Sequence, residues 1–253
     1  MTIPNVEARH ATGSTARLAP EALELVRRSR RHPRPTQFDY LHVRSLLDDI
    51  RSALGGVTGD VRDVLDVYCG SRPYDDLFPA GARHVGLDIV DNPYGVADVT
   101  SDEFLPFDDE AFDLVTCFEA FHYVPDPESG VAELWRVLRP GGTALVSVPF
   151  AWEYNATILE HRYTEPELRD LFRAWSDVRV VESGGQAIVW ATVTGSLLES
   201  LRKRLPRRLG APFGLAYLGI NGFAAMLDRV ERRRPPGPAR LPMNLLLVAR
   251  RPA

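Results

Sequence analysis

The sequence has 253 residues, of which 45% are hydrophobic and 25% charged, as expected for one soluble globular domain, with or without a substantial insertion. Its net charge of −4 provides no basic field, so we expect no nucleic-acid partner. Its two cysteines give neither a disulfide pattern nor a metal-ligand cluster. The sequence also lacks a signal-peptide pattern and an apolar run of the ~18 residues that span a membrane, so we expect a cytoplasmic location.

The N-terminal part of the chain differs in composition from the rest. Residues 1–35 are polar and rich in Arg, Pro and Ser, which predicts a flexible N-terminal segment. Within it, Pro20 favours the start of a short helix that runs to Arg31. Residues 36–253 form the predicted domain, and apolar residues at helical spacing within 36–54 predict a helix that covers its core.

Strand and helix patterns alternate from residue 61 onward, which predicts a parallel sheet with helices on both faces. A helix begins near residue 127 and is expected to end at Pro140-Gly141-Gly142. Another helix follows Thr164, with Glu167 three residues later completing a capping box. The predicted strands lie at residues 63–67, 83–87, 112–117, 143–148, 178–182 and 243–251.

The regular alternation breaks between residues 183 and 240. This segment reads as two mostly apolar helices with basic ends, inserted before the last strand. A substrate lid or a homodimer surface is the favoured interpretation. The basic segment RKRLPRRLG beside apolar stretches leaves an interfacial membrane contact as a less favoured alternative.

The stretch VLDVYCGSRPYDDLF, residues 64–78, predicts a strand followed by a tight ligand-binding turn. A dinucleotide-binding turn needs several glycines because its backbone must approach a diphosphate closely. Only Gly70 is present here, and Tyr68 and Arg72 would crowd that approach. Asp88 follows Asp66 at about the spacing at which an acid meets ribose hydroxyls. The pattern therefore favours a ligand with a ribose and a cationic group but no diphosphate.

Four segments, in order, resemble the class I S-adenosylmethionine-dependent methyltransferases of the type 11 kind, over roughly residues 61–150. They are VLDVYCGSRPY, HVGLDIVDNP, ADVTSDEFLPFDDEAFDLVTCFEAFHYVPDP and ELWRVLRPGGTALVSVPF. The resemblance implies an α/β fold, a Rossmann-like three-layer sandwich with a mostly parallel seven-stranded sheet and a helical insertion before the last strand. It also implies S-adenosylmethionine as the cofactor and transfer of its methyl group as the activity.

The resemblance also assigns cofactor-binding positions. Asp66, Tyr68 and Gly70 would line the methionine end of the cofactor, although Tyr68 and Arg72 depart from the glycines of the family pattern. The other positions carried over are Asp88 for the ribose hydroxyls, Ile89, Asp98 and Val99 for the adenine, and Phe118 and Glu119 where the fourth strand meets the cofactor.

An alcohol is a poor nucleophile until its proton leaves, so O-methylation benefits from a general base. The catalytic candidates are His122, which follows the predicted strand 112–117, and Tyr154 and His161, which follow the predicted strand 143–148. For His122, packing or cofactor contact is the alternative. The resemblance to glycan-modifying methyltransferases suggests a divalent cation such as Mg²⁺ in addition, but no ligand cluster in the sequence identifies its site.

The motifs identify the methyl donor rather than the acceptor. The first hypothesis for the acceptor is a hydroxyl of a small polar molecule. A sugar or oligosaccharide, such as a methylated polysaccharide precursor, is the favoured molecule of this class. Trp152, Tyr154 and Tyr163 could stack on a sugar face, with core packing as the alternative. A lipid or quinone-like acceptor at a membrane surface is the second hypothesis. A non-catalytic, S-adenosylmethionine-binding assembly protein is the third.

Overall fold

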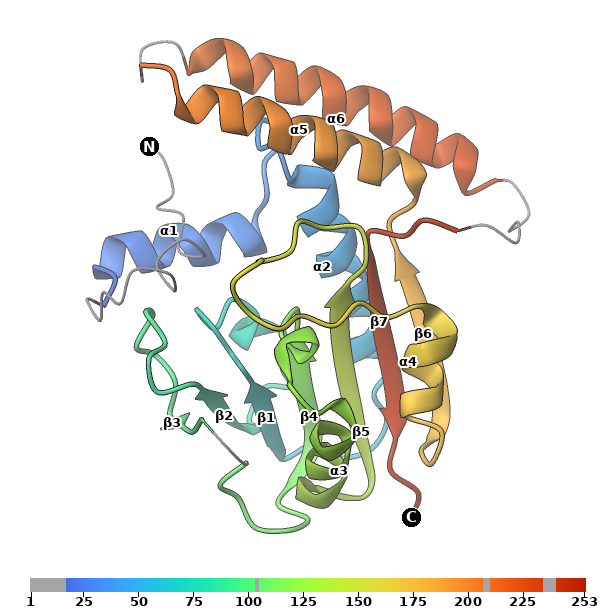
Figure 1. Ribbon diagram of the computed structural model, residues 1–253. Helices are drawn as coiled ribbons and strands as arrows, with labels where there is room; N and C mark the ends of the chain where they lie inside the picture. The colour runs from blue at the N-terminus through green and yellow to red at the C-terminus, as the bar shows by residue number, and fades with distance from the viewer. Residues whose placement is uncertain (1–16, 103–104, 207–209, 234–239) are drawn as a thin grey trace.

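The computed structural model describes residues 17–102, 105–206, 210–233 and 240–253, which form a seven-stranded sheet with helices on both faces (Figure 1). The strand order is β3-β2-β1-β4-β5-β7-β6. Neighbouring strands from β3 to β5 run parallel, and β7 is antiparallel to both β5 and β6. The strands are β1 (Asp63–Val67), β2 (Arg83–Asp88), β3 (Val99–Thr100), β4 (Phe112–Phe118), β5 (Leu138–Pro149), β6 (Ser176–Ser183) and β7 (Asn244–Arg250).

The helices occupy the positions that the apolar spacing predicts. They are α1 (Pro20–Arg31), α2 (Tyr40–Gly55), α3 (Pro127–Val137), α4 (Glu165–Leu171), α5 (Gln186–Lys203) and α6 (Ala211–Glu231). At the start of α4, Glu167 accepts a 2.8 Å hydrogen bond from the backbone N–H of Thr164, which confirms the capping box. The pair α5 and α6 lies between β6 and β7, which confirms the helical insertion before the last strand.

The sheet is buried on both faces because adjacent residues of its central strands enter different cores. Leu114 of β4 packs with Leu47 and Ile50 of α2. The next residue, Val115, belongs to the core that contains Leu134 of α3 and other side chains of that face. Nearly continuous apolar strands are the expected sequence of a parallel sheet that helices cover on both sides.

Two predicted boundaries are wrong. α3 ends at Val137, and β5 already begins at Leu138, so Pro140-Gly141-Gly142 lies inside the strand rather than at the end of the helix. A register shift between Phe112 and Leu114 of β4 accommodates this irregular start of β5. The short β3 is absent from the predicted strands because two residues are too few to show an alternating pattern.

The described part of the predicted flexible segment is fixed to the domain. Val26 of α1 is buried, and the side chain of Arg27 donates a 2.6 Å hydrogen bond to the carbonyl of Ser71. Residues 17–35 therefore do not behave as a separate flexible unit, and residues 1–16 of that prediction lie outside the described residues. Among the described helices, none has the length and apolar character needed to cross a membrane.

Candidate functional site

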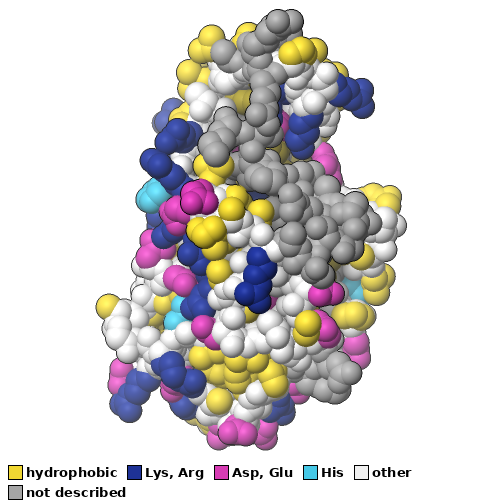
Figure 2. Space-filling view, turned by 90° about the vertical axis from the view of Figure 1, so that its left-hand side faces the viewer, with side chains coloured by type: hydrophobic (Ala, Val, Ile, Leu, Met, Phe, Trp, Pro, Cys, Tyr) yellow, Lys and Arg dark blue, Asp and Glu magenta, His cyan; other side chains and the backbone are white. Residues whose placement is uncertain are grey.

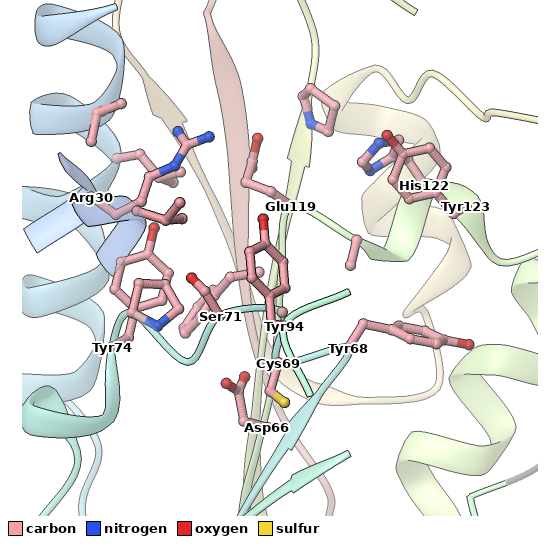
Figure 3. A pocket seen from close by; sticks show the side chains of 18 of the residues that line it. Arg30, Asp66, Tyr68, Cys69, Ser71, Tyr74, Tyr94, Glu119, His122 and Tyr123 are labelled. Atoms are coloured by element: carbon pink, nitrogen blue, oxygen red, sulfur yellow. The ribbon is translucent and has the colours of Figure 1, made fainter. Parts of the chain in front are cut away.

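A pocket of about 260 Å³ opens at the carboxyl ends of β1 and β4, the edge of a parallel sheet where ligands of α/β proteins bind. Helices α1 and α2 close it on one side, and the ends of the strands and the loops after β1, β2, β4 and β5 form the rest of its wall. In Figure 3, Arg30 and Glu119 lie across one end, Asp66 lies at the base, and His122 and Tyr123 lie on the side opposite Arg30.

The loop after β1 folds as a glycine-rich loop would, although it contains one glycine. Tyr68, Gly70 and Arg72 all have φ values of 55–56°, in the left-handed region that glycine adopts without steric cost. Tyr68 contributes to the wall of the pocket. Arg72 points away from it, and its guanidinium pairs with Asp75 at 2.9 Å and with Asp98 at 2.5 Å. Tyr68 and Arg72 therefore leave this pocket open, and the crowding of a diphosphate stays a prediction.

Asp66 lies at the base of the pocket as a buried acid. It is 3% exposed, and its Oδ1 accepts a 2.7 Å hydrogen bond from the hydroxyl of Thr116 on the neighbouring strand. Burial raises the pKa of Asp66 to about 7, although the hydrogen bond from Thr116 opposes this shift. A nearby cationic ligand would restore the charged form because it compensates for the lost hydration.

Glu119 follows β4 and is held by Ser147 of β5. Its backbone N–H donates to the Ser147 carbonyl and hydroxyl at 3.0 and 2.9 Å, and that hydroxyl donates to Oε1 of Glu119 at 2.8 Å. Burial raises the pKa of Glu119 to about 7, against the Ser147 hydrogen bond and the positive charge of Arg30. Glu119 thus titrates near neutral pH inside the pocket, a property suited to proton transfer.

The residues expected to bind adenosine lie along the end of β2. The carboxylate of Asp88 accepts hydrogen bonds from the backbone N–H groups of Gly70, at 2.6 Å, and Ile89, at 2.8 Å. Asp98 accepts from the N–H of Gly86 at 2.8 Å, and this bond and Arg72 lower its pKa against the effect of burial. Val99 pairs with Leu87 in the sheet. Asp66, Tyr68, Gly70, Phe118 and Glu119 line the pocket, whereas Asp88, Ile89, Asp98 and Val99 lie outside its wall.

Of the three catalytic candidates, only His122 lines the pocket. It is 3% exposed, and burial lowers its pKa to about 4, so its imidazole is neutral at pH 7. His161 contacts His122 through the backbone, because the His161 N–H donates a 2.8 Å hydrogen bond to the His122 carbonyl. Tyr154 is 71% exposed and is not brought to the pocket.

Several pocket residues were not among the sequence candidates, notably Arg30, His42, Tyr74 and Tyr94. Arg30 lies near the end of α1, a helix that the sequence predicts within the N-terminal segment. The basic residues at the end of this helix are the one sequence feature that points to Arg30. Tyr94 lies after β2, and the sequence gives no pattern that would single it out. Burial lowers the pKa of His42 to about 3, which makes it a neutral wall residue at physiological pH.

The described residues offer no cluster of metal-ligating side chains for the expected divalent cation. Within the described ranges, no group of three or more His, Cys, Asp or Glu side chains is arranged to hold a metal ion. Cys69 and Cys117 are both free thiols, and both are buried. The divalent cation therefore stays a prediction.

Comparisons with known proteins agree with this fold. Residues 65–146 match the family model described as a methyltransferase domain. Curated relatives include ubiquinone biosynthesis O-methyltransferases from Alkalilimnicola ehrlichii, 33% identical over 40% of this chain and 46% of that protein, and from Sodalis glossinidius, 32% identical over 48% and 52%. The chain thus spans about half the length of the curated relatives it matches.

Similar solved structures include a chain from the Haloferax volcanii complex between the Trm112 methyltransferase activator and a methyltransferase. It has a TM-score of 0.53 and 20% identity, and the match covers 100% of both chains. The [4+2]-cyclase SpnF has the same TM-score and 18% identity over 84% of this chain and 82% of its own. These likenesses support the fold, and the cyclase illustrates that one fold can host different reactions.

The residues that line the pocket also fit S-adenosylmethionine, the cofactor that the family resemblance implies. The buried carboxyl of Asp66 and the cation of Arg30 both line the pocket, and these match a ligand that carries both an ammonium and a carboxylate. Residues 65–146 thus match a methyltransferase domain, and the seven-stranded sheet around them has the Rossmann-like fold of the class I methyltransferases.

Proposed function

We propose that the protein is an O-methyltransferase that uses S-adenosylmethionine to methylate a hydroxyl group of a small acceptor. The observation that carries this proposal is the pocket at the carboxyl edge of the sheet, with Asp66 at its base and Arg30 and Glu119 at one end. When bound, S-adenosylmethionine supplies a methyl group on a positively charged sulfur.

Residues of the pocket would hold the cofactor through charge and hydrogen bonding. Asp66 would accept from the ammonium group, and Arg30 would donate to the carboxylate of the methionine end. Asp88 would accept from the ribose hydroxyls. Its two oxygens also accept from the backbone N–H groups of Gly70 and Ile89, which fix the orientation of the carboxylate.

Glu119 and His122 are the groups that could take the proton of the acceptor hydroxyl. Glu119, with a pKa of about 7, is better matched to this task than His122, with a pKa of about 4, because a base works best when its pKa lies near the working pH. Glu119 was expected to contact the cofactor, so it now has two competing roles that kinetics can separate. Tyr123 and Trp152 would form the aromatic wall on the acceptor side.

Within this function, we infer a phenol or quinol hydroxyl as the acceptor. Aromatic and aliphatic side chains line much of the pocket, including Val26, Leu46, Tyr123 and Trp152. The relatives named for O-methylation in ubiquinone biosynthesis support the same chemical class. Tyr163 is a core residue and Tyr154 lies outside the pocket, so the aromatic platform expected for a sugar is not assembled. The sugar acceptor stays a prediction.

The first test is calorimetric titration of the protein with S-adenosylmethionine and S-adenosylhomocysteine, beside the variant Asp88→Ala. We expect binding that the variant weakens strongly. Methyl transfer from labelled donor to catechols, hydroquinones and monosaccharides then identifies the acceptor class. Tight binding with no turnover of any acceptor would instead support the non-catalytic binding protein, and no binding at all would contradict the proposal.

The role of Glu119 is tested by Glu119→Gln. If Glu119 is the general base, the variant should have a kcat ~10²–10⁴-fold lower, while its affinity for the methyl donor changes little. The kcat of the unmodified protein should rise with pH up to about 7, and this dependence should disappear in the variant. Glu128→Gln, at an exposed glutamate of α3, is the control. An effect on donor affinity alone would assign Glu119 to cofactor binding.

A further inference from the structure

The outer face of the helix pair α5 and α6, called here the hairpin, is an extended exposed apolar surface. Val193, Leu197 and Leu201 of α5 and Leu215, Phe223 and Met226 of α6 are each between 46% and 71% exposed. Figure 1 shows the two helices side by side across one end of the molecule, beyond the edge of the sheet. Contiguous apolar surface of this kind commonly marks a binding site for another protein or for a membrane.

The inner face of the hairpin is fixed to the domain by specific contacts. The side-chain amide of Asn221 donates to the carbonyls of Pro35 and Gln37 at 2.9 and 2.8 Å. At Gly195, a Cβ atom would lie only 2.8 Å from the carbonyl oxygen of Phe38, so α5 approaches the chain closely there. Glu231 of α6 accepts hydrogen bonds from the first N–H groups of α5. The outer face is therefore presented by a firmly attached element.

The charges of the hairpin are confined to its ends. Glu199 is the only charged residue of the sequence between Gln186 and Leu201, and it pairs with Arg202. α6 has none between Ala211 and Leu227. At one end, Arg202, Lys203 and Arg204 outnumber Glu199. At the other, Arg229, Arg232 and Arg233 outnumber Asp228 and Glu231. Figure 2 shows hydrophobic side chains beside Lys and Arg at the top of the molecule.

The positive charge at both ends of the hairpin distinguishes between two possible partners of its outer face, a second copy of the chain and a lipid surface. A second copy of the chain would place one hairpin against another, and both the parallel and the antiparallel arrangement would bring cations against cations. An anionic lipid surface would accept the apolar side chains below its headgroups and would attract the cations at both ends. We propose that the outer face of the hairpin docks on an anionic membrane surface.

Docking of the hairpin would bring the pocket close to the lipid. Trp152, which lines the pocket, packs against the buried cluster under the hairpin that contains Ile188 and Ala224. The side chain of Ser196 in α5 donates to Glu153 in the loop after β5. The inference rests on the hairpin alone and does not depend on the chemistry proposed for the pocket.

The test is co-sedimentation with vesicles made of equal parts phosphatidylglycerol and phosphatidylcholine, compared with vesicles of phosphatidylcholine alone. We expect binding to the anionic vesicles that weakens in high salt, and binding at least about tenfold weaker to the neutral ones. The double variant Val193→Glu/Leu197→Glu should lose the interaction. Lys203→Glu/Arg204→Glu should reduce it by at least about tenfold.

The control is Arg62→Glu/Arg173→Glu, which makes the same charge change at exposed positions outside the hairpin and should bind as the unmodified protein does. Thermal unfolding confirms that each variant is folded, and donor titration keeps this question separate from the proposed function. Absence of vesicle binding, or binding that the hairpin variants do not change, would overturn the inference. A dimer in sedimentation analysis that Val193→Glu/Leu197→Glu dissociates, without vesicle binding, would assign the face to a second copy.

Discussion

At the residue scale, burial sets the chemistry of Asp66. Its carboxyl has little access to water and accepts a hydrogen bond from the Thr116 hydroxyl, but burial outweighs that hydrogen bond and raises the pKa to about 7. A buried acid with this pKa exists in both protonation states at neutral pH. It can therefore couple proton release to the binding of a cation.

We expect the affinity for S-adenosylmethionine to increase as the pH rises from 6 to 8, because the cationic ligand binds the ionised form of Asp66. Asp66→Asn should weaken binding by ~10- to 100-fold, the effect of one hydrogen bond to a charged group. It should also flatten the pH dependence. Calorimetry at several pH values measures both effects. A pH dependence that survives in Asp66→Asn would show that another group controls binding.

The same shift has a consequence for stability. In the native state Asp66 holds its proton up to about pH 7, whereas in the unfolded state it releases the proton near the ordinary aspartate pKa of 3.8. The free energy of unfolding should therefore fall as the pH rises between about 4 and 7, by ~1.4 kcal/mol per unit of pKa difference for a fully realised shift. Asp66→Asn should reduce this fall in urea unfolding measured across that range. An unchanged slope would contradict the raised pKa.

At the element scale, the loop after β1 shows how backbone conformation can replace composition. Two non-glycine residues, Tyr68 and Arg72, adopt left-handed φ values that cost of order 1–3 kcal/mol each. Arg72 is held in place by its ion pairs with Asp75 and Asp98, which offset part of that cost. The Arg72 side chain thus ties the loop to Asp75 and to Asp98, the residue just before β3.

Gly70→Ala should destabilise the protein through backbone conformation rather than through crowding. A Cβ at Gly70 would meet only the ring of Tyr94, at an ordinary 3.9 Å, but the φ of +56° costs an alanine ~1–2 kcal/mol. Thermal unfolding should show a Tm lower by roughly 2–8 °C. Gly56→Ala is the control, since its φ is −90°. Equal Tm values for the two variants would show that the loop can relax.

At the scale of the whole molecule, the pocket is completed by segments far apart in the sequence. The pocket is lined by Arg30 of α1, His42 of α2 and Trp152 of the loop after β5. The hairpin in turn holds residues 35 and 37, between α1 and α2, through Asn221. The N-terminal helix, α2 and the insertion are therefore one connected structure around the pocket.

Arg30→Ala should weaken binding of S-adenosylmethionine by ~10- to 100-fold, because Arg30 is the cation expected to meet its carboxylate. Arg28→Ala, at an exposed arginine of the same helix, should bind normally. Calorimetry measures the affinities, and thermal unfolding checks that α1 remains in place. If both variants bind the cofactor as the unmodified protein does, α1 is only a structural cover.

Local patterns in the sequence determined much of this protein. Hydrophobic patterns indicated six strands, and the helical spacing and the Thr164–Glu167 capping box located helices. The central parallel strands are nearly continuously apolar because helices cover both faces of the sheet there, whereas β6 alternates between more and less exposed positions. The family resemblance assigned Asp66, Gly70, Phe118 and Glu119 to the cofactor site, and all four line the pocket at the carboxyl ends of the strands. Their cofactor contacts stay a prediction.

Only the tertiary structure decided the features that depend on distant segments. It brought Arg30 and Tyr94 to the pocket, left Tyr154 in solvent and buried Tyr163 in the core. It also raised the pKa values of Asp66 and Glu119, because burial depends on what packs over a residue and no local pattern encodes that. The sequence fixes which faces are apolar, but a face is buried or exposed only when the chain has folded around it.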